Sequence, residues 1–381
     1  MQIPAVGQEA QLVGIAMLFC CRVCGTTYRS EEVLHGFMCR TCRSPLEVCS
    51  YNVEWNPQGV GISRYHSMLP LKPVRSLGEG STPIVPIDMH TVKVIFKLEY
   101  LNPSGSFKDR GSTVAISHVF QVGAKCIVED SSGNAGFSAA LYARVLGIDP
   151  YIVVPSGISY SKRVAIEVAG GNIVEAPSRE EASYKAKVLS SEKGCYYVNH
   201  TSNPLYIEGY KTVSYEVFEE VGEIDAAIVP VGSGGLFIGI YRGFNELYRM
   251  GFIRKRPRMV AVQGVDVAPI YERLYGSKDL GGTSVLADGI RIQSPPRIDE
   301  IVQIIEKSGG MVTLVSDSEI IDSIRRLRDL GFIVEPTSAT AHAALIKVVE
   351  KLRGMNVETI LVPLTGAGIK MLPQLKQILG L

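Results

Sequence analysis

The sequence predicts an α/β protein with two doubly wound, mostly parallel sheets, preceded by a small cysteine-rich module. Apolar β-branched runs alternate with helical patterns from residue 92 to residue 362. Two Cys-x2-Cys pairs lie within residues 1–50. A chain of 381 residues can form two or three domains with sizeable cores. We expect a leader and cysteine module over 1–50, a large domain made of 51–98 and 212–381, and a small domain over 99–211.

The composition indicates a folded globular protein, with 46% hydrophobic and 20% charged residues. The formal net charge is +1, so no overall field recruits nucleic acid or an anionic membrane, and neither is an expected partner. No apolar run approaches the about 20 residues of a membrane helix. Residues 12–21 are fairly apolar, but no basic region precedes them and no cleavage site is clear. We therefore expect a cytoplasmic protein without a secretory signal.

The first motif is a set of four cysteines, Cys21, Cys24, Cys39 and Cys42, arranged as two Cys-x2-Cys pairs with 14 residues between them. Each pair can form a knuckle that offers two thiolates, and two knuckles complete a tetrahedral zinc site. A redox role is the alternative for a Cys-x-x-Cys motif. No basic and aromatic cluster surrounds the motif, which favours a structural zinc over a nucleic-acid contact. Cys126 and Cys195 stand alone in the body, so we expect no disulfide framework and a reducing compartment.

Beyond the module, residues 51–80 contain scattered prolines and glycines and indicate an irregular linker. The runs of β-branched residues predict strands at Val92–Phe96, Lys125–Val128, Tyr151–Val154, Ala226–Val231, Met259–Val262 and Thr359–Val362. Helical patterns between them predict helices at Gly136–Leu146, Ser161–Ala169, Glu180–Glu192, Ile320–Leu330 and Thr340–Leu352.

A lysine segment follows the first of these strands, with the sequence Asn-Pro-Ser-Gly-Ser-Phe-Lys-Asp-Arg-Gly over residues 102–111. The turn residues predict a tight loop, with Ser106 as a cap and Lys108 in the first turn of a helix. The helix dipole disfavours a cation there, so we expect the pKa of Lys108 to be lowered. An amine with a lowered pKa can attack a carbonyl and form a Schiff base. The alternative is a surface lysine balanced by Asp109.

Three further loops follow predicted strands, where ligands bind in open α/β sheets. Residues 129–136, Glu-Asp-Ser-Ser-Gly-Asn-Ala-Gly, open a helix with small polar residues whose amides suit a carboxylate. Residues 232–236, Gly-Ser-Gly-Gly-Leu, suit a single phosphate, because Phe237 replaces the next glycine of a dinucleotide fingerprint. Residues 363–368 form another glycine turn, containing Thr365. Each loop taken singly is also what a capped turn looks like.

Taken together, the four segments resemble pyridoxal-phosphate enzymes of the tryptophan-synthase-β fold type (fold type II). The string LEYLNPSGSFKDRG is most similar to the threonine synthase branch, and the resemblance spans roughly residues 75 to 381. It implies that Lys108 holds pyridoxal 5′-phosphate and shuttles protons. It also implies that Thr365 contacts the pyridine nitrogen and that Asn134 contacts the ring oxygen. The cofactor phosphate would be held by Gly232, Ser233, Gly234, Gly235 and Leu236.

The same resemblance implies the substrate contacts. Ser131, Ser132 and Asn134 would hold the substrate carboxylate, whereas Asn203 and Lys211 belong to a stretch that resembles a domain-crossing segment of the branch. Arg291, with Lys162 or Arg163, is a candidate partner for a substrate phosphate. The resemblance also implies a homodimer, and the cysteine module is similar to that of archaeal-type threonine synthases.

We therefore expect a lyase that converts O-phosphohomoserine and water to threonine and phosphate. Threonine synthases usually carry Thr where this chain has Ala135. This departure leaves open a serine or threonine dehydratase, or a cysteine or cysteate synthase that uses O-phosphoserine. A different class of function, a ribbon protein that binds nucleic acid or a partner through a degenerate enzyme body, is disfavoured by the intact Lys108, Asn134 and Thr365.

Overall fold

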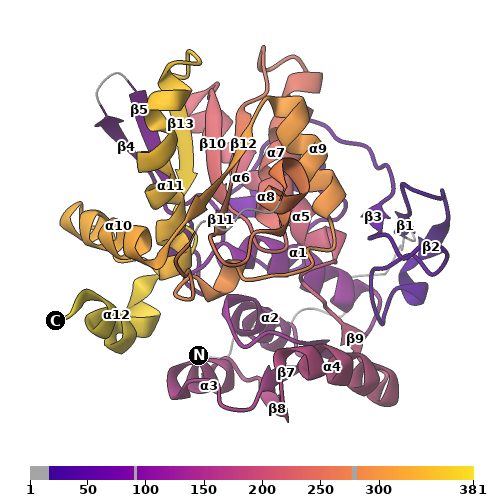
Figure 1. Cartoon of the computed structure of the whole chain (residues 1–381). Coiled ribbons are helices and arrows are strands. Elements are labelled where there is room, and N and C mark those ends of the chain that lie inside the picture. Colours follow the sequence, from indigo (N-terminus) through magenta and orange to yellow (C-terminus); the bar gives the residue numbers. More distant parts are fainter. Residues whose placement is uncertain (1–16, 90–91, 277–280) are drawn as a thin grey trace.

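The computed structural model describes residues 17–89, 92–276 and 281–381, which form three sheets (Figure 1). The amino-terminal module carries a small antiparallel sheet in the order β2-β1-β3, made of Leu18–Cys20 (β1), Thr27–Arg29 (β2) and Glu47–Val48 (β3). It lies to one side of the two larger sheets (Figure 1). No helix in the described part of the chain is both long enough and apolar enough to cross a bilayer.

The largest sheet has six strands in the order β12-β11-β10-β13-β5-β4. Its strands are Ile84–Met89 (β4), Val92–Lys97 (β5), Ala226–Pro230 (β10), Arg258–Gly264 (β11), Met311–Val315 (β12) and Thr359–Pro363 (β13). All neighbours are parallel except β4, which pairs antiparallel with β5 at the edge. The central strands are buried on both faces, which explains why they appear as unbroken apolar runs in the sequence.

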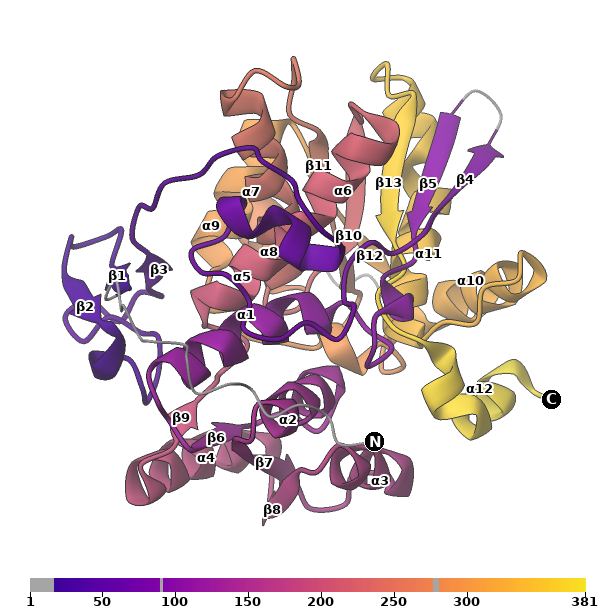
Figure 2. The ribbon, with the colours of Figure 1, turned by 180° about the vertical axis from the view of Figure 1, so that it is seen from behind.

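Helices cover both faces of this sheet (Figures 1 and 2). Ala227 and Val229 of β10 belong to the cluster formed with one set of helices: Pro204–Tyr210 (α5), Thr212–Val221 (α6), Gly235–Arg249 (α7), Pro269–Tyr275 (α8) and Ile298–Ser308 (α9). Ile228 between them belongs to the cluster with the other set: Asp317–Asp329 (α10), Pro336–Arg353 (α11) and Leu372–Leu379 (α12). The alternation is that of a strand packed on both sides.

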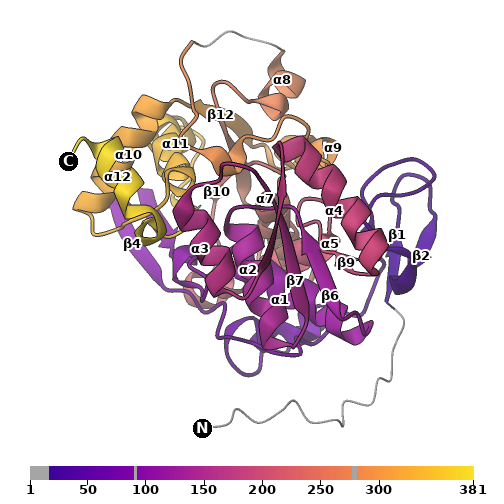
Figure 3. The same cartoon turned by 90° about the horizontal axis from the view of Figure 1, so that it is seen from below.

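The third sheet is parallel, in the order β8-β7-β6-β9, and is best seen from below (Figure 3). Its strands are Cys126–Glu129 (β6), Asp149–Pro155 (β7), Asn172–Ala176 (β8) and Tyr196–Tyr197 (β9). Asn134–Val145 (α2) and Tyr160–Val168 (α3) pack on one face, and Arg179–Lys193 (α4) on the other. Lys108–Gln121 (α1) contacts α2 and α5 and so joins the two larger sheets.

The predicted fold class is confirmed, and every predicted strand and helix is present with bounds shifted by a few residues. The sequence did not predict the strands β4, β8, β9 and β12, of which β8 is an edge strand with two polar residues, or the short helices α5 and α8. The domain boundaries given above stay a prediction. The expectation of unpaired body cysteines is wrong, because a disulfide joins Cys126 of β6 to Cys195, next to β9. Parallel pairing of β6 with β9 brings two cysteines together that are 69 residues apart in sequence.

Helices α1 and α5 cross with almost no space between their backbones. A Cβ on Gly209 would lie 2.0 Å from the Arg110 carbonyl oxygen, and a Cβ on Gly111 would lie 2.2 Å from Cδ1 of Tyr206. Arg110 itself is buried and forms ion pairs with Glu99 at 2.7 Å and with Glu216 at 2.6 Å. These contacts fix the start of α1 relative to the neighbouring helices.

The amino-terminal module docks on the carboxyl-terminal half of α1. His118 lies within hydrogen-bond distance of Ser30 Oγ, at 2.9 Å from Nε2, and of Tyr196 Oη, at 3.1 Å from Nδ1. The ring of Phe19 packs edge-on against His118. Burial lowers the pKa of His118 to about 4, so the ring is neutral at pH 7. The module is thus attached to the helix that begins at Lys108.

Candidate active site

The four segments singled out in the sequence lie at the carboxyl ends of β5, β6, β10 and β13. The carboxyl ends of β5, β10 and β13 share one edge of the six-stranded sheet, so their loops converge there. The loop after β6, in the other sheet, is joined to them through Asn134, which bonds to Glu335 and Lys370. The loop before α1 is bonded directly to the loop after β13: the Phe107 amide donates to the Thr365 carbonyl (3.1 Å), and the Ala367 amide donates to the Gly105 carbonyl (2.9 Å). Lys108 and Thr365 are therefore held in fixed relation.

Lys108 is the first residue of α1 and is half-buried. Burial lowers the pKa of its ammonium to about 8, against the opposing charge of Glu129. Over residues 17–89, 92–276 and 281–381 its Nζ has no hydrogen-bond or ion-pair partner, and it lies 4.9 Å from the centre of the Phe107 ring. The amine is thus poised to lose its proton near neutral pH. The predicted lowering of its pKa has burial, rather than the helix dipole, as its largest cause.

Asp109 does not balance Lys108, contrary to the surface alternative. Its carboxylate accepts from the Ser104 amide (2.6 Å) and from Ser138 Oγ (2.5 Å), which anchors the lysine loop to α2. Burial raises the pKa of Asp109 to about 6. The predicted cap is wrong: Phe107, not Ser106, precedes the helix, and no side chain caps it.

The Thr365 hydroxyl is available for a ligand. Thr365 is buried, and its amide donates to Ser338 Oγ (2.8 Å), but its own Oγ1 makes no hydrogen bond within the described chain. The oxygen is not among the fully buried polar atoms of the described chain, so a ligand can reach it. The site therefore offers a neutral donor and acceptor beside the lysine.

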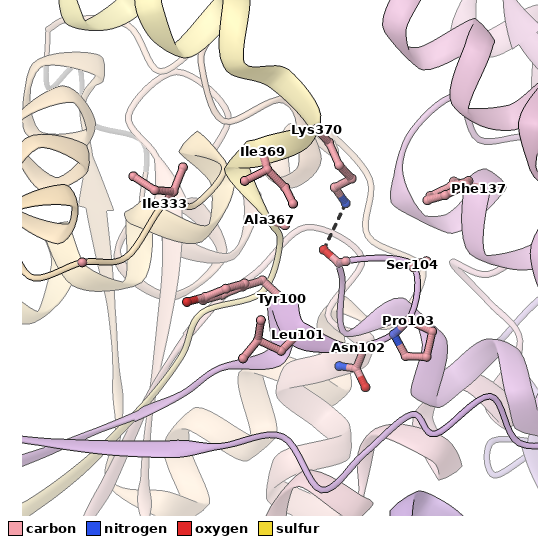
Figure 4. A pocket seen from close by; sticks show the side chains of 12 residues that line it. Tyr100, Leu101, Asn102, Pro103, Ser104, Phe137, Ile333, Ala367, Ile369 and Lys370 are labelled. Carbon is pink, nitrogen blue, oxygen red and sulfur yellow. Dashed lines mark hydrogen bonds between the residues drawn. The ribbon is translucent and has the colours of Figure 1, made fainter.

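Asn134, at the start of α2, is held by two residues from the carboxyl-terminal part of the chain. Its Nδ2 donates to Glu335 Oε2 at 2.8 Å, and Lys370 Nζ donates to its Oδ1. Lys370 also donates to the Gly105 carbonyl at 3.0 Å (Figure 4). Its Nζ lies 3.2 Å from Glu335 Oε1. Lys370 borders a cavity of about 560 Å³ that also reaches the turn at Ser104 and Gly105. Lys370 and Glu335 thus fix the orientation of the Asn134 amide.

The glycine loop after β10 has the properties of an anion cradle. None of the amides from Gly232 to Phe237 donates to another described residue, and Gly235 begins α7. A Cβ at Gly232 would lie 2.8 Å from the Gly289 carbonyl oxygen, and one at Gly234, whose φ is +88°, would lie 2.3 Å from Ile301. Only glycine fits these two positions. Unpaired amides at a helix start bind phosphate.

Shared neighbours connect this cradle to the lysine. Gly235 packs against the Tyr210 ring, with an added Cβ 3.2 Å from Cε2, and the Tyr210 ring centre is 5.0 Å from that of Phe107. A pyridoxal phosphate requires an amine for its aldehyde, amides for its phosphate and a polar group for its ring nitrogen. Lys108, the cradle and Thr365 supply these three, so the site fits the cofactor.

The residues predicted to bind substrate have different environments. Ser131 and Ser132 are half-buried in the loop before α2. Asn203 is buried and uses its amide locally, accepting from the Leu205 amide and donating to the Val198 carbonyl. Lys211 is buried and paired with Glu208 (2.6 Å) and Glu246 (2.9 Å).

The predicted phosphate partners are also paired with carboxylates. Arg291 contacts Asp266 at 2.5 Å, Lys162 contacts Asp288 at 2.7 Å, and Arg163 pairs with Glu175. The pairs of Lys162 and Arg163 are exposed, which makes them weak. The Arg291 loop does lie at the active site, because Gly289 packs against Gly232.

Three side chains at the site, those of Glu129, Lys370 and His200, were not among the site residues predicted from the sequence. Glu129 is the last residue of β6 and is buried, with His200 Nδ1 2.5 Å from its Oε1. An acidic pair, Glu129-Asp130, at the carboxyl end of a parallel strand was the signal that could have found this contact.

The four cysteines of the module come together as predicted. Their sulfurs lie within 4.8 Å of one another, with Cys21 and Cys42 at 3.3 Å and Cys24 and Cys39 at 3.5 Å. Tyr28 Oη lies 3.2 Å from the Cys39 sulfur. Four cysteine sulfurs at this spacing fit a tetrahedral zinc ion.

Comparison with known proteins supports the same chemistry. Residues 75–366 match the family model described as "Pyridoxal-phosphate dependent enzyme". Threonine synthase of Methanocaldococcus jannaschii is 31% identical over 381 residues, covering 93% of each chain. Threonine synthase of Synechocystis is 31% identical over 340 residues, covering 86% of this chain and 87% of that protein. Maize serine racemase, a solved structure, is 26% identical with a TM-score of 0.67, covering 78% of this chain and 91% of that one.

The family match spans the lysine segment, the Asn134 loop, the glycine cradle and Thr365, which are the segments that converge at the strand ends. The chain belongs to the family of pyridoxal-phosphate dependent enzymes, in which it is a lyase related to the threonine synthases.

Proposed function

We propose that this lyase converts O-phosphohomoserine and water to threonine and phosphate. The relatives named above, two threonine synthases, support this substrate. The observation that carries the chemistry is the Lys108 amine, which has a pKa of about 8 and no partner among the described residues. Two backbone hydrogen bonds, Phe107 to Thr365 and Ala367 to Gly105, join its loop to the loop that carries Thr365. When bound, pyridoxal phosphate would supply the aldehyde for this amine and the electron sink that acidifies substrate C–H bonds.

Proton transfer, substrate binding and cofactor binding are the roles of side chains and backbone amides of this chain. Lys108 takes protons from substrate carbons and returns them, a role that needs an amine whose pKa is near the working pH. Ser131, Ser132 and Asn134 hold the substrate carboxylate, and the amides of 232–236 hold the cofactor phosphate. Thr365 offers a hydroxyl, not a carboxylate, to the ring nitrogen, which moderates the electron sink and favours elimination and replacement over transamination.

A serine or threonine dehydratase is a second candidate, and two observations favour it. Ala135 stands, buried, where threonine synthases usually carry Thr. The cations predicted to bind a substrate phosphate are already paired with carboxylates, which would compete with that phosphate. A substrate with a neutral hydroxyl does not need these cations. A synthase that uses O-phosphoserine, like a threonine synthase, would need one of these paired cations for its substrate phosphate.

Three steady-state assays test the proposal. Phosphate release is measured from O-phosphohomoserine and from O-phosphoserine, and keto-acid formation is measured from threonine. We expect kcat/KM for O-phosphohomoserine to exceed the others by at least about 100-fold, or about 2.7 kcal/mol. Lys108→Ala is the inactive control. Faster keto-acid formation would establish the dehydratase instead.

We also propose that the cysteine module binds one structural zinc, and that the enzyme is a cytoplasmic homodimer whose only ligands are its cofactors and a small amino-acid substrate. The geometry of the four sulfurs supports the zinc. Elemental analysis and light scattering on the purified protein measure the zinc content and the oligomeric state.

A further inference from the structure

One dyad of polar side chains at the site is not used by the mechanism above. Glu129 is fully buried at the end of β6, and His200 lies in the segment between β9 and α5 with 14% of its side chain exposed. His200 Nδ1 is 2.5 Å from Glu129 Oε1, and the His200 amide donates to Oε2 at 3.3 Å. Because a carboxylate only accepts, Nδ1 must carry the hydrogen. The ring is thereby fixed in orientation, and its Nε2 has no partner among the described residues.

The dyad lies beside the reacting groups. Glu129 immediately precedes the loop 130–133, which carries the residues proposed to hold the substrate carboxylate. Its charge acts on the Lys108 amine. The His200 ring packs edge-on against Tyr206, with the centres 6.3 Å apart, and Tyr206 Oη is 3.3 Å from Ser112 Oγ, one turn after Lys108. Tyr206 thus connects the His200 ring to the first turn of α1.

The other candidate acids near the site are already engaged. Lys370 donates to Asn134 and Gly105, Lys211 pairs with Glu208 and Glu246, and Arg291 pairs with Asp266. The Nε2 of His200, by contrast, has no partner in the described chain and so can carry a proton that is free to be donated. The Glu129 carboxylate compensates the positive charge of the ring when both nitrogens are protonated.

We propose that His200, held by Glu129, is the general acid that protonates the leaving oxygen of the substrate side chain; this rests on the proposed elimination chemistry. Lys108 takes the proton of the neighbouring C–H bond, whose electron pair forms the new C=C bond. The C–O bond breaks, its electron pair stays on oxygen, and the proton of Nε2 joins that oxygen. The ring keeps its Nδ1–H bond to Glu129 and regains the Nε2 proton from water. His200 is the catalytic residue of the dyad, and Glu129 positions it.

The test uses the holoenzyme and two kinds of leaving group. In His200→Asn, the side-chain amide can donate to Glu129 in place of Nδ1, but no atom replaces Nε2. On the wild type's best oxygen substrate, O-phosphohomoserine or threonine, we expect kcat to fall at least about 100-fold, the lower range for a lost general acid. On β-chloroalanine, whose chloride leaves without a proton, we expect a fall of less than about threefold. Glu129→Gln should show the same selectivity with a smaller loss.

The outcomes separate the inference from the proposed function. Equal losses on both leaving groups, or no loss on either, would overturn the acid role while wild-type turnover still upholds the lyase. A wild type that acts on no oxygen substrate overturns both. Turnover that requires added Mg²⁺ or Mn²⁺ would instead identify Glu129, Asp130 and His200, whose ligand atoms lie within 4.8 Å, as a cation site. His35→Asn, in the amino-terminal module, is the matched control, and visible absorbance reports cofactor retention.

Discussion

At the scale of single residues, the environment of Lys108 sets its reactivity. Burial disfavours the charged form of the ammonium, which among the described residues has only the face of Phe107 against it and no hydrogen-bond acceptor. Glu129 opposes this, because a carboxylate favours the charged form. The balance keeps a substantial fraction of free amine at neutral pH, which a solvated lysine lacks.

This balance predicts the pH dependence of cofactor uptake by the apoprotein. The rate of reaction with pyridoxal 5′-phosphate, followed by absorbance, should rise with pH through a midpoint of about 8, because the amine is protonated below that value. Glu129→Gln should move the midpoint lower, since the charge that favours the ammonium is gone. Nα-acetyl-lysine is the control for the cofactor's own ionisations. A midpoint near 10.4, the ordinary lysine value, would contradict the burial argument.

A second prediction concerns the Thr365 hydroxyl. Thr365→Asp would place a carboxylate where the neutral hydroxyl lies and favour a protonated ring nitrogen. We expect kcat to fall at least about tenfold, equivalent to about 1.4 kcal/mol, while cofactor binding survives because Lys108 and the glycine cradle are unchanged. Thr365→Ser, which keeps the hydroxyl, is the matched control. Wild-type turnover in the Asp variant would reduce Thr365 to a turn residue.

The sequence predicted residues of this kind when they stood in a contiguous motif. Lys108, Asn134, the glycine loop and Thr365 each lie within a short string of turn residues after a strand. Lys370 was missed because its partner Asn134 is 236 residues away, and Glu129 and His200 are 71 residues apart. Contacts of this range depend on how elements far apart in the sequence pack together, which no local pattern describes.

At the scale of elements, most of the predicted strands were found because they are largely buried on both faces and so consist mainly of apolar residues. Edge strands such as β8, and short helices buried all round such as α5, carry no such signature. The pairing of β6 with β9, which brings Cys126 and Cys195 together, could not be predicted from the local sequence either. A disulfide that closes a loop of this length restricts the unfolded chain considerably.

The disulfide should therefore stabilise the four-stranded sheet. Replacing both partners, Cys126→Ser with Cys195→Ala, should lower the free energy of unfolding by about 2–4 kcal/mol in urea titrations. Reducing agent should lower the stability of the wild type but have little further effect on the double variant. This comparison corrects for any action of the reductant on the cysteine module. Equal stability of the two oxidised proteins would show that the bond makes no net contribution.

At the scale of the whole molecule, the amino-terminal module is attached to the body on several sides. Ser30 and Phe19 contact His118 of α1, the Tyr197 amide donates to the Leu34 carbonyl at 2.7 Å, and Glu47 pairs with Arg297 and Arg242. Burial of Glu47 is offset by these two arginines, which hold its pKa at about 2. The module is small, so its own core is insufficient to fold without a metal or a docking surface.

Removal of the metal should therefore loosen the module and its contacts with the body. Purified protein should contain one zinc per chain, and Cys39→Ser should release it. Limited proteolysis should then cut within residues 17–50, and hydrogen exchange should increase at the contacts around His118. Cys49→Ser, outside the four-cysteine set, is the control. Protein that binds no zinc after reduction, yet resists protease, would assign the cysteines another role.

The close crossing of α1 and α5 also limits which alleles of this gene can persist. Every missense change in a glycine codon adds a Cβ. At Gly209 that atom would lie 2.0 Å from a backbone oxygen, which, unlike a side-chain atom, cannot rotate away. At Gly111 the two nearest obstacles are side-chain atoms of Tyr206, and the Tyr206 Cα follows at 3.0 Å, so a change there needs a smaller residue 206 and a small backbone shift. Gly354 meets nothing nearer than 3.5 Å and has an ordinary helical φ of −62°, so its codon is free to drift. In a pooled library under selection, Gly354 variants should persist, Gly209 variants should vanish, and Gly111 variants should appear only in company with a second change.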